Sequence, residues 1–215
     1  MKRFLQICLF LCVVFLLIGI LPFIYWQFIF TRGRTEHGLA ADRAIVKAGN
    51  TLREKYGLYP VCIGGSCTGP SITSFALDFN RYGPAFDRDE ARELILECLD
   101  IFHKMVNEDD DVRKFLSAYP FPLNGMHIGI YNLLPSGYSH DHPDILIVRY
   151  TGDAIRYVTE APELRNTNKY TSEYEESYEE AVEIVKKQQR ARHAALGMVC
   201  PETISPPSEE TLKTR

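Results

Sequence analysis

The sequence has too few cysteines and too few basic residues for two common classes of protein. Six cysteines in 215 residues do not suffice for a scaffold held together by disulfides. Lys and Arg number 24 against 28 Asp and Glu, and the net charge is −4. This balance disfavours a protein that follows the phosphates of a nucleic acid, so we expect no nucleic-acid partner. The chain is nevertheless 46% hydrophobic, which excludes disorder throughout.

The densest part of that hydrophobicity lies in residues 4–30, a run of 27 residues of which 23 are apolar and none is charged. A helix of this length reaches about 40 Å, and the hydrocarbon core of a bilayer is about 30 Å thick. The exit of the run, LPFIYWQFIFTRGR, lacks the small residues of a signal-peptide cleavage site. The sequence therefore predicts an uncleaved transmembrane anchor in residues 1–34, which binds the lipid bilayer through residues 4–30.

Basic residues flank the run on both sides, and residues 35–215 carry the remaining charge of −8. Lys2 and Arg3 precede the run, whereas Arg32 and Arg34 follow it. A short basic tail before a long apolar run is typical of a signal anchor whose N-terminus lies in the cytoplasm. Residues 35–200 are long enough for one domain, and the polar, proline-rich residues 201–215 are predicted to be a disordered tail.

Periodic patterns predict four helices and five strands in this domain. The helices are expected at residues 36–56, from Asp87 to about residue 105, near residues 112–119 and at residues 172–190, because apolar residues recur there at steps of three and four. Strands are expected at residues 58–63, 72–80, 125–134, 145–150 and 154–159. The segment GGSCTGPS is predicted to be the turn of a first hairpin, and TGD that of a second.

The order of these elements indicates the fold class. Strands and helices do not alternate regularly, which argues against a doubly wound parallel sheet. We therefore expect an α+β fold: an antiparallel sheet of about five strands with helices packed on it, preceded by one transmembrane helix.

Three stretches resemble a known family: LRE-KYGLY, the segment DEARELILECLDIFHKMVNEDDDVRKFLSAYPFPLNGMHIGIY, and YEESYEEAVEIV. The chain is similar over residues 38–185 to a family of uncharacterised, N-terminally membrane-anchored bacterial proteins of chlamydiae and their relatives. The resemblance implies a single-pass protein of the bacterial inner membrane. The family has no assigned activity, so no functional residue is carried over.

The sharpest candidate site is the segment Ser139–Asp144, which reads S-H-D-H-P-D. His140, His142 and Asp144 are side chains of the types that bind Zn²⁺ or a similar ion, and with a bound water they would make a hydrolytic site. The competing interpretation is a polar loop, because Ser, Asp, His and Pro are ordinary turn residues and no further zinc-ligand spacing accompanies them.

A second candidate is the glycine-rich segment containing Gly64, Gly65, Ser66 and Cys67. Successive glycines let backbone N–H groups converge on an anion, and such donors would favour a reactive thiolate at Cys67. The competing interpretation is a simple hairpin turn, because the segment matches no phosphate-binding motif. Cys62 and Cys67 flank this turn and could form a disulfide outside the cytoplasm.

These observations favour a non-catalytic binding or envelope-associated protein that needs no cofactor and has a protein partner. The alternative is a metal-dependent hydrolase that uses His140, His142 and Asp144.

Overall fold

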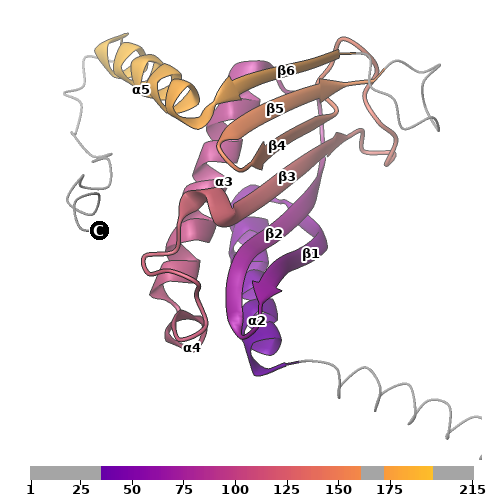
Figure 1. Ribbon diagram of the computed structural model, residues 1–215. Coiled ribbons are helices and arrows are strands. Elements are labelled where there is room, and N and C mark those ends of the chain that lie inside the picture. The colour runs from indigo at the N-terminus through magenta and orange to yellow at the C-terminus, as the bar shows by residue number, and fades with distance from the viewer. Residues whose placement is uncertain (1–34, 161–171, 196–215) are drawn as a thin grey trace, which may run out of the picture.

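The computed structural model of the chain describes residues 35–160 and 172–195 (Figure 1). The helices are α2 (Glu36–Tyr56), α3 (Arg88–Glu108), α4 (Asp110–Arg113) and α5 (Tyr178–Ala195), with a 3₁₀ turn at Leu123–Gly125. The strands are β1 (Tyr59–Thr68), β2 (Ser71–Tyr82), β3 (Met126–Leu133), β4 (Ile147–Thr151), β5 (Ala154–Thr159) and β6 (Ser172–Ser177). The predicted anchor at residues 1–34 and the predicted tail at 201–215 lie outside the described residues. Among the helices within these two ranges, none is both long and apolar enough to cross a bilayer.

The strands form one sheet in the order β1-β2-β3-β4-β5-β6, which confirms the α+β class and corrects two finer expectations. The sheet has six strands, and it is mixed, because β2 and β3 run parallel while all other neighbours are antiparallel. The parallel pair arises because α3 carries the chain back along the sheet before β3 begins. A helical crossover is the usual way to connect parallel neighbours.

The sixth strand occupies the start of the segment that we expected to be one helix at residues 172–190. Residues 172–177 pair with β5, and α5 begins only at Tyr178. Tyr174 and Glu176 are two residues apart on β6, where they are the cross-strand partners of Tyr157 and Ile155 of β5. Residues two apart on a strand lie on the same face of the sheet. The spacing of Tyr174 and Tyr178 is therefore compatible with one helix and also with a strand followed by a helix. Hydrogen bonding to β5 makes residues 172–177 a strand.

Helices cover one face of the sheet, and the hydrophobic core lies between them and the strands. In Figure 1, α2 and α3 pass behind the sheet, and they contact β1 to β4. Successive strands send alternate residues into this layer, where Phe75, Leu77 and Phe79 of β2 are opposite Met126, Ile128 and Ile130 of β3, and all six are buried. Helix α3 has the predicted capping box between Asp87 and Glu90.

A buried ionic cluster joins α3 to β6. Arg92 and Glu176 are each 3% exposed, and the guanidinium donates two hydrogen bonds to the carboxylate, at 2.7 and 3.0 Å. Asp89 accepts another hydrogen bond from Arg92, and the Tyr157 hydroxyl donates to Glu176. Burial lowers the pKa of Arg92, but its hydrogen bonds to Glu176 and Asp89 more than offset that effect, so the pKa is raised. The guanidinium therefore stays charged inside the protein.

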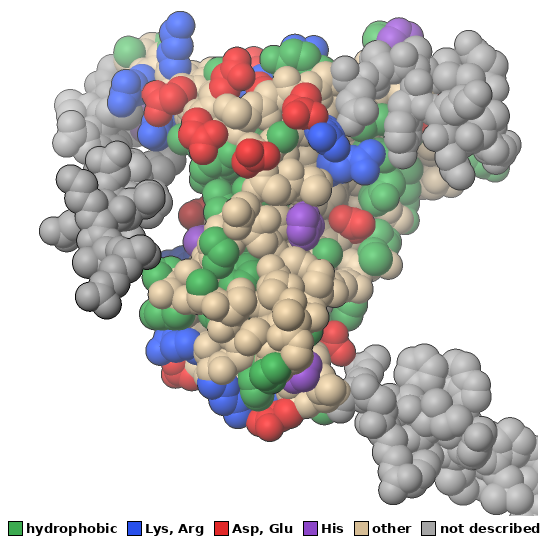
Figure 2. Space-filling model, in the orientation of Figure 1, with side chains coloured by type: hydrophobic (Ala, Val, Ile, Leu, Met, Phe, Trp, Pro, Cys, Tyr) green, Lys and Arg blue, Asp and Glu red, His purple; other side chains and the backbone are tan. Residues whose placement is uncertain are grey.

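The opposite face of the sheet is not covered by any described helix. In Figure 2 this face is mainly tan, the colour of the backbone and of side chains that are neither hydrophobic, charged nor histidine. One row crosses it from β2 to β6 and consists of Asp78, Gly129, Arg149, Arg156 and Glu175. The Asp78 carboxylate lies over Gly129, where a Cβ would come within 2.7 Å of its Oδ1. Burial raises the pKa of Asp78, although the charge of Arg149 and the Gly129 N–H act against this. The row places Arg149 directly opposite Arg156, and each arginine has an acidic side chain on its outer side, because Arg149 acts on Asp78 and Arg156 donates to Glu175.

Candidate functional site

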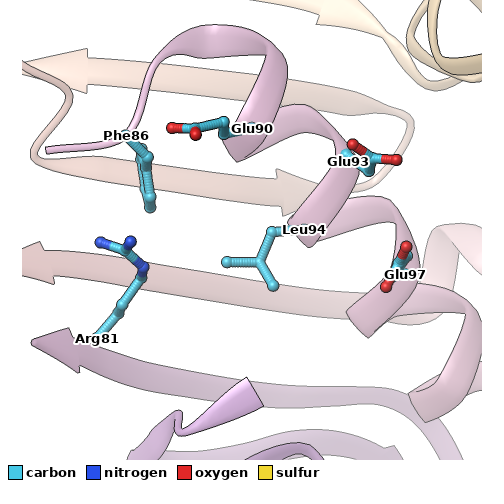
Figure 3. A pocket seen from close by; sticks show the side chains of 6 residues that line it. All are labelled: Arg81, Phe86, Glu90, Glu93, Leu94 and Glu97. Carbon is cyan, nitrogen blue, oxygen red and sulfur yellow. The ribbon is translucent and has the colours of Figure 1, made fainter. Parts of the chain in front are cut away.

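A groove lies between the first half of α3 and the carboxyl end of β2, close to the carboxyl end of β3. It is lined by Arg81, Phe86, Glu90, Glu93, Leu94 and Glu97. Figure 3 shows Leu94 projecting from α3 into the groove, with the ring of Phe86 and the guanidinium of Arg81 facing each other beside it. Pockets that combine an apolar lining with a few convergent polar side chains are the usual candidates for ligand binding. The groove is therefore the leading candidate site among the described residues.

Helix periodicity places the three carboxylates along one side of the groove. Glu90, Glu93 and Glu97 are spaced by three and four residues, so they share a face of α3 that is turned away from the buried stripe through Ile95, Leu99 and Phe102. The groove contains three acidic side chains and one basic side chain, which gives it a formal charge of −2.

Arg81 is held in place by its surroundings. Its NH1 donates to the carbonyl of Pro84 at 2.8 Å and to Oδ1 of Asn132 at 2.6 Å, and its guanidinium lies 5.0 Å from the ring centre of Phe86. Burial lowers the pKa of Arg81, and the nearby charge of Glu90 opposes that change. The side chain thus forms a fixed wall of the groove.

The glutamates also make contacts that orient them. Glu97 accepts a hydrogen bond from the Tyr56 hydroxyl, and the pKa of Tyr56 is raised by its burial and by this bond. Glu93 accepts from Arg192 at 2.9 and 3.1 Å. The backbone N–H of Asp87 donates to Glu90 at 3.1 Å. Each carboxylate has two oxygens and about four acceptor positions, so these contacts leave acceptors for a ligand.

The histidines of the predicted metal loop point to separate partners. His140 is 5% exposed, and its Nε2 lies 3.1 Å from the carbonyl oxygen of Gly83. Its Nδ1 is 3.8 Å from Asp144, while Nδ1 of His142 is 3.2 Å from the hydroxyl of Thr159. Within residues 35–160 and 172–195, no group of three or more His, Cys, Asp or Glu side chains is arranged to hold a metal ion. The hydrolase interpretation gains no support from this geometry.

We expect the two histidines to affect stability unequally. Replacing His140 with alanine leaves the buried Gly83 carbonyl without its partner and should cost about 1–3 kcal/mol. His142→Ala should cost less, because His142 is exposed. Urea unfolding with and without a chelator measures both effects, and the chelator should change neither midpoint. A stoichiometric divalent ion that survives dialysis and is lost in the double variant would contradict this prediction and restore the metal site.

The predicted anion or thiol loop is a strand, which corrects that expectation. Gly64, Gly65, Ser66 and Cys67 belong to β1 and pair with β2, and the chain reverses only at Gly69 and Pro70. Extended pairing turns successive N–H groups to opposite sides, so they do not converge on an anion. Gly65 has a packing role, because a Cβ there would lie 2.3 Å from the carbonyl oxygen of Ser74.

The same strand excludes a disulfide between Cys62 and Cys67 within one chain. Both cysteines are free and exposed, and five residues of β-strand separate their Cα atoms by roughly 16 Å. A disulfide requires about 4.4–6.8 Å. A turn between the two cysteines, as predicted for GGSCTGPS, would have allowed that distance, but both residues lie on β1.

Sequence reasoning did not identify the groove, although part of its signal was present. Glu90 was recognised only as a helix cap, and the spacing of Glu93 and Glu97 after it could have indicated one acidic side of α3. The approach of Arg81 and Phe86 to that side depends on the packing of β2 against α3. No family model, no curated protein and no solved structure matches this chain, so the geometry alone supports the site.

Proposed function

We propose that the chain is a membrane-anchored, non-catalytic binding protein whose α3 groove receives a basic side chain of a protein partner. The observation that carries this proposal is the set of three glutamates beside an apolar floor. A lysine or arginine has an apolar stem and a cationic head. Leu94 and Phe86 would contact the stem, and Glu90 and Glu97 would bind the head through charge-assisted hydrogen bonds.

The composition of the groove favours binding over catalysis. Its lining contains no Ser, Cys, His or Lys, and so no nucleophile paired with a histidine base. Arg81 already donates hydrogen bonds to two protein oxygens. The groove as a whole has a net negative charge, and that charge favours a cationic ligand. Among the described residues, no observation favours the hydrolase alternative, and we do not propose it.

The proposal is tested with a lysine-rich peptide and the full chain in nanodiscs of neutral lipid, which do not themselves attract the peptide. Glu90→Gln combined with Glu97→Gln keeps side-chain size and removes two charges. We expect the double variant to bind about threefold to tenfold more weakly in fluorescence anisotropy, and the loss should shrink as salt is added.

The matched control is Glu108→Gln combined with Glu179→Gln, which removes the same charge from exposed positions outside the groove. This control should bind almost as well as the original chain. Equal weakening in both variants would show that the peptide senses only net charge, and the groove proposal would then fail. A peptide with norleucine in place of lysine should not bind.

A further inference from the structure

The first strand leaves an unprotected edge of the sheet. Within the sheet β1 pairs only with β2, and nine of its ten residues are exposed. Helix α2 contacts β1 from one face, but no described strand pairs with the outer edge of β1. An edge strand presents about half of its backbone N–H and C=O groups to solvent. Such a row of donors and acceptors fits another β-strand.

The two edges of the sheet differ in charge. β6, at the other edge, has three glutamates in six residues, whereas β1, YPVCIGGSCT, has no charged residue in ten. Figure 2 shows the same contrast, with acidic side chains gathered near β6 and α5 and a mostly tan and green surface over β1 and β2. Charged edge residues prevent edge-to-edge pairing. The edge at β6 has this protection, and the edge at β1 does not.

The side chains of β1 also suit a pairing partner. Val61 and Ile63, two residues apart on β1, are 52% and 44% exposed, although β-branched aliphatic residues are usually buried. Cys62 to Ser66 keep an unbroken register with β2, and the irregularities fall on either side, at Val61 and at Thr73 of β2. The middle of the strand is therefore regular enough to accept a second neighbour.

We propose that β1 pairs antiparallel with β1 of a second copy of this chain, so that two sheets join into one across a twofold axis. An uncharged strand meets an equally long uncharged strand, and no like charges are brought together. Twofold pairing uses the same surface on both copies and closes after two. Cys62 of both chains would lie on the uncovered face, because Cys62 is on the Asp78 side of the sheet. This proposal is independent of the groove.

The test is the oligomeric state of the full chain in detergent, measured by light scattering across a range of concentrations. We expect a dimer. Val61→Lys combined with Ile63→Lys places charges on the edge at exposed positions, and the dimer should dissociate about tenfold more readily or not form. Leu134→Lys, at a position 37% exposed in the β3–β4 connection, is the control and should remain dimeric. Circular dichroism should show that all variants are folded.

Crosslinking and hydrogen exchange locate the interface. In a chain that keeps Cys62 as its only cysteine, a bismaleimide should link two copies, and the two lysine substitutions should abolish the link. A monomeric chain overturns the proposal. So does a dimer that persists in the Val61→Lys/Ile63→Lys variant, since it must form elsewhere. A monomer whose β1 amides are nevertheless protected from exchange would show that a strand of different origin occupies the edge, and that result also overturns self-pairing.

Discussion

Replacing Glu176 with alanine is expected to destabilise the domain by about 3–5 kcal/mol, because the variant leaves the Arg92 guanidinium buried without its main counter-charge. Glu176 is 3% exposed and accepts from Arg92 and Tyr157. The loss would remove much of the stability of a single domain, which is about 5–15 kcal/mol. Urea unfolding followed by circular dichroism measures it.

The control for this prediction removes both charges. Arg92→Met combined with Glu176→Leu should recover a large part of the loss, because a buried ion pair can be replaced by apolar residues of similar volume at little cost. Arg156→Met combined with Glu175→Leu is the matched exposed pair, since those side chains are 43% and 50% exposed. It should change stability by less than about 1 kcal/mol. If Glu176→Ala and the exposed double variant cost the same, the buried cluster does not hold β6 to α3.

Phe102→Ala is expected to cost about 3–5 kcal/mol, since it opens a cavity in the centre of the core. Phe102 is fully buried on α3, and its ring centre lies 6.3 Å from that of Phe75 in an edge-to-face arrangement. The substitution removes contacts between α3 and β2, the two elements that also form the groove. Chemical unfolding of the purified chain gives the difference.

Tyr119→Ala provides a comparison for the loss of an aromatic ring at the surface. Tyr119 is 58% exposed and its ring centre is 4.8 Å from the guanidinium carbon of Arg113. We expect a cost below about 1 kcal/mol, which is the range of an exposed cation–π contact. A Phe102→Ala cost as small as that of Tyr119→Ala would mean that the stripe through Ile95 and Phe102 is not the core face of α3.

The best-predicted elements are those whose sequence signal is local. α2 occupies the predicted residues 36–56 and ends at Gly57, whose φ of 67° is the left-handed conformation that glycine favours at a helix end. α3 begins at the predicted Asp87 cap. The hairpin of β4 and β5 turns at the predicted TGD segment. In each case the deciding contacts lie within a few residues of each other.

Predictions that depended on distant neighbours were less accurate. The helix expected at residues 112–119 is only four residues long, because the chain leaves the helix to place Ile72 beside Leu116. β1 extends five residues beyond its expected end at Ile63, since the glycines allow close approach to β2. The hydrophobic periodicity within residues 112–119 or 58–68 does not indicate these contacts with β2, because the contacting residues lie elsewhere in the chain.

The sequence by itself determined the α+β class, the main helices and the residues of the core, because hydrophobic periodicity and caps act over one or two turns. Tertiary structure alone decided the parallel pairing of β2 with β3, the strand at residues 172–177 and the groove on α3. It also gave His140 and His142 different hydrogen-bond partners and placed Cys62 and Cys67 on one extended strand. These features arise from contacts between residues far apart in the chain, such as Arg92 with Glu176, and their geometry is fixed only when the sheet and helices pack.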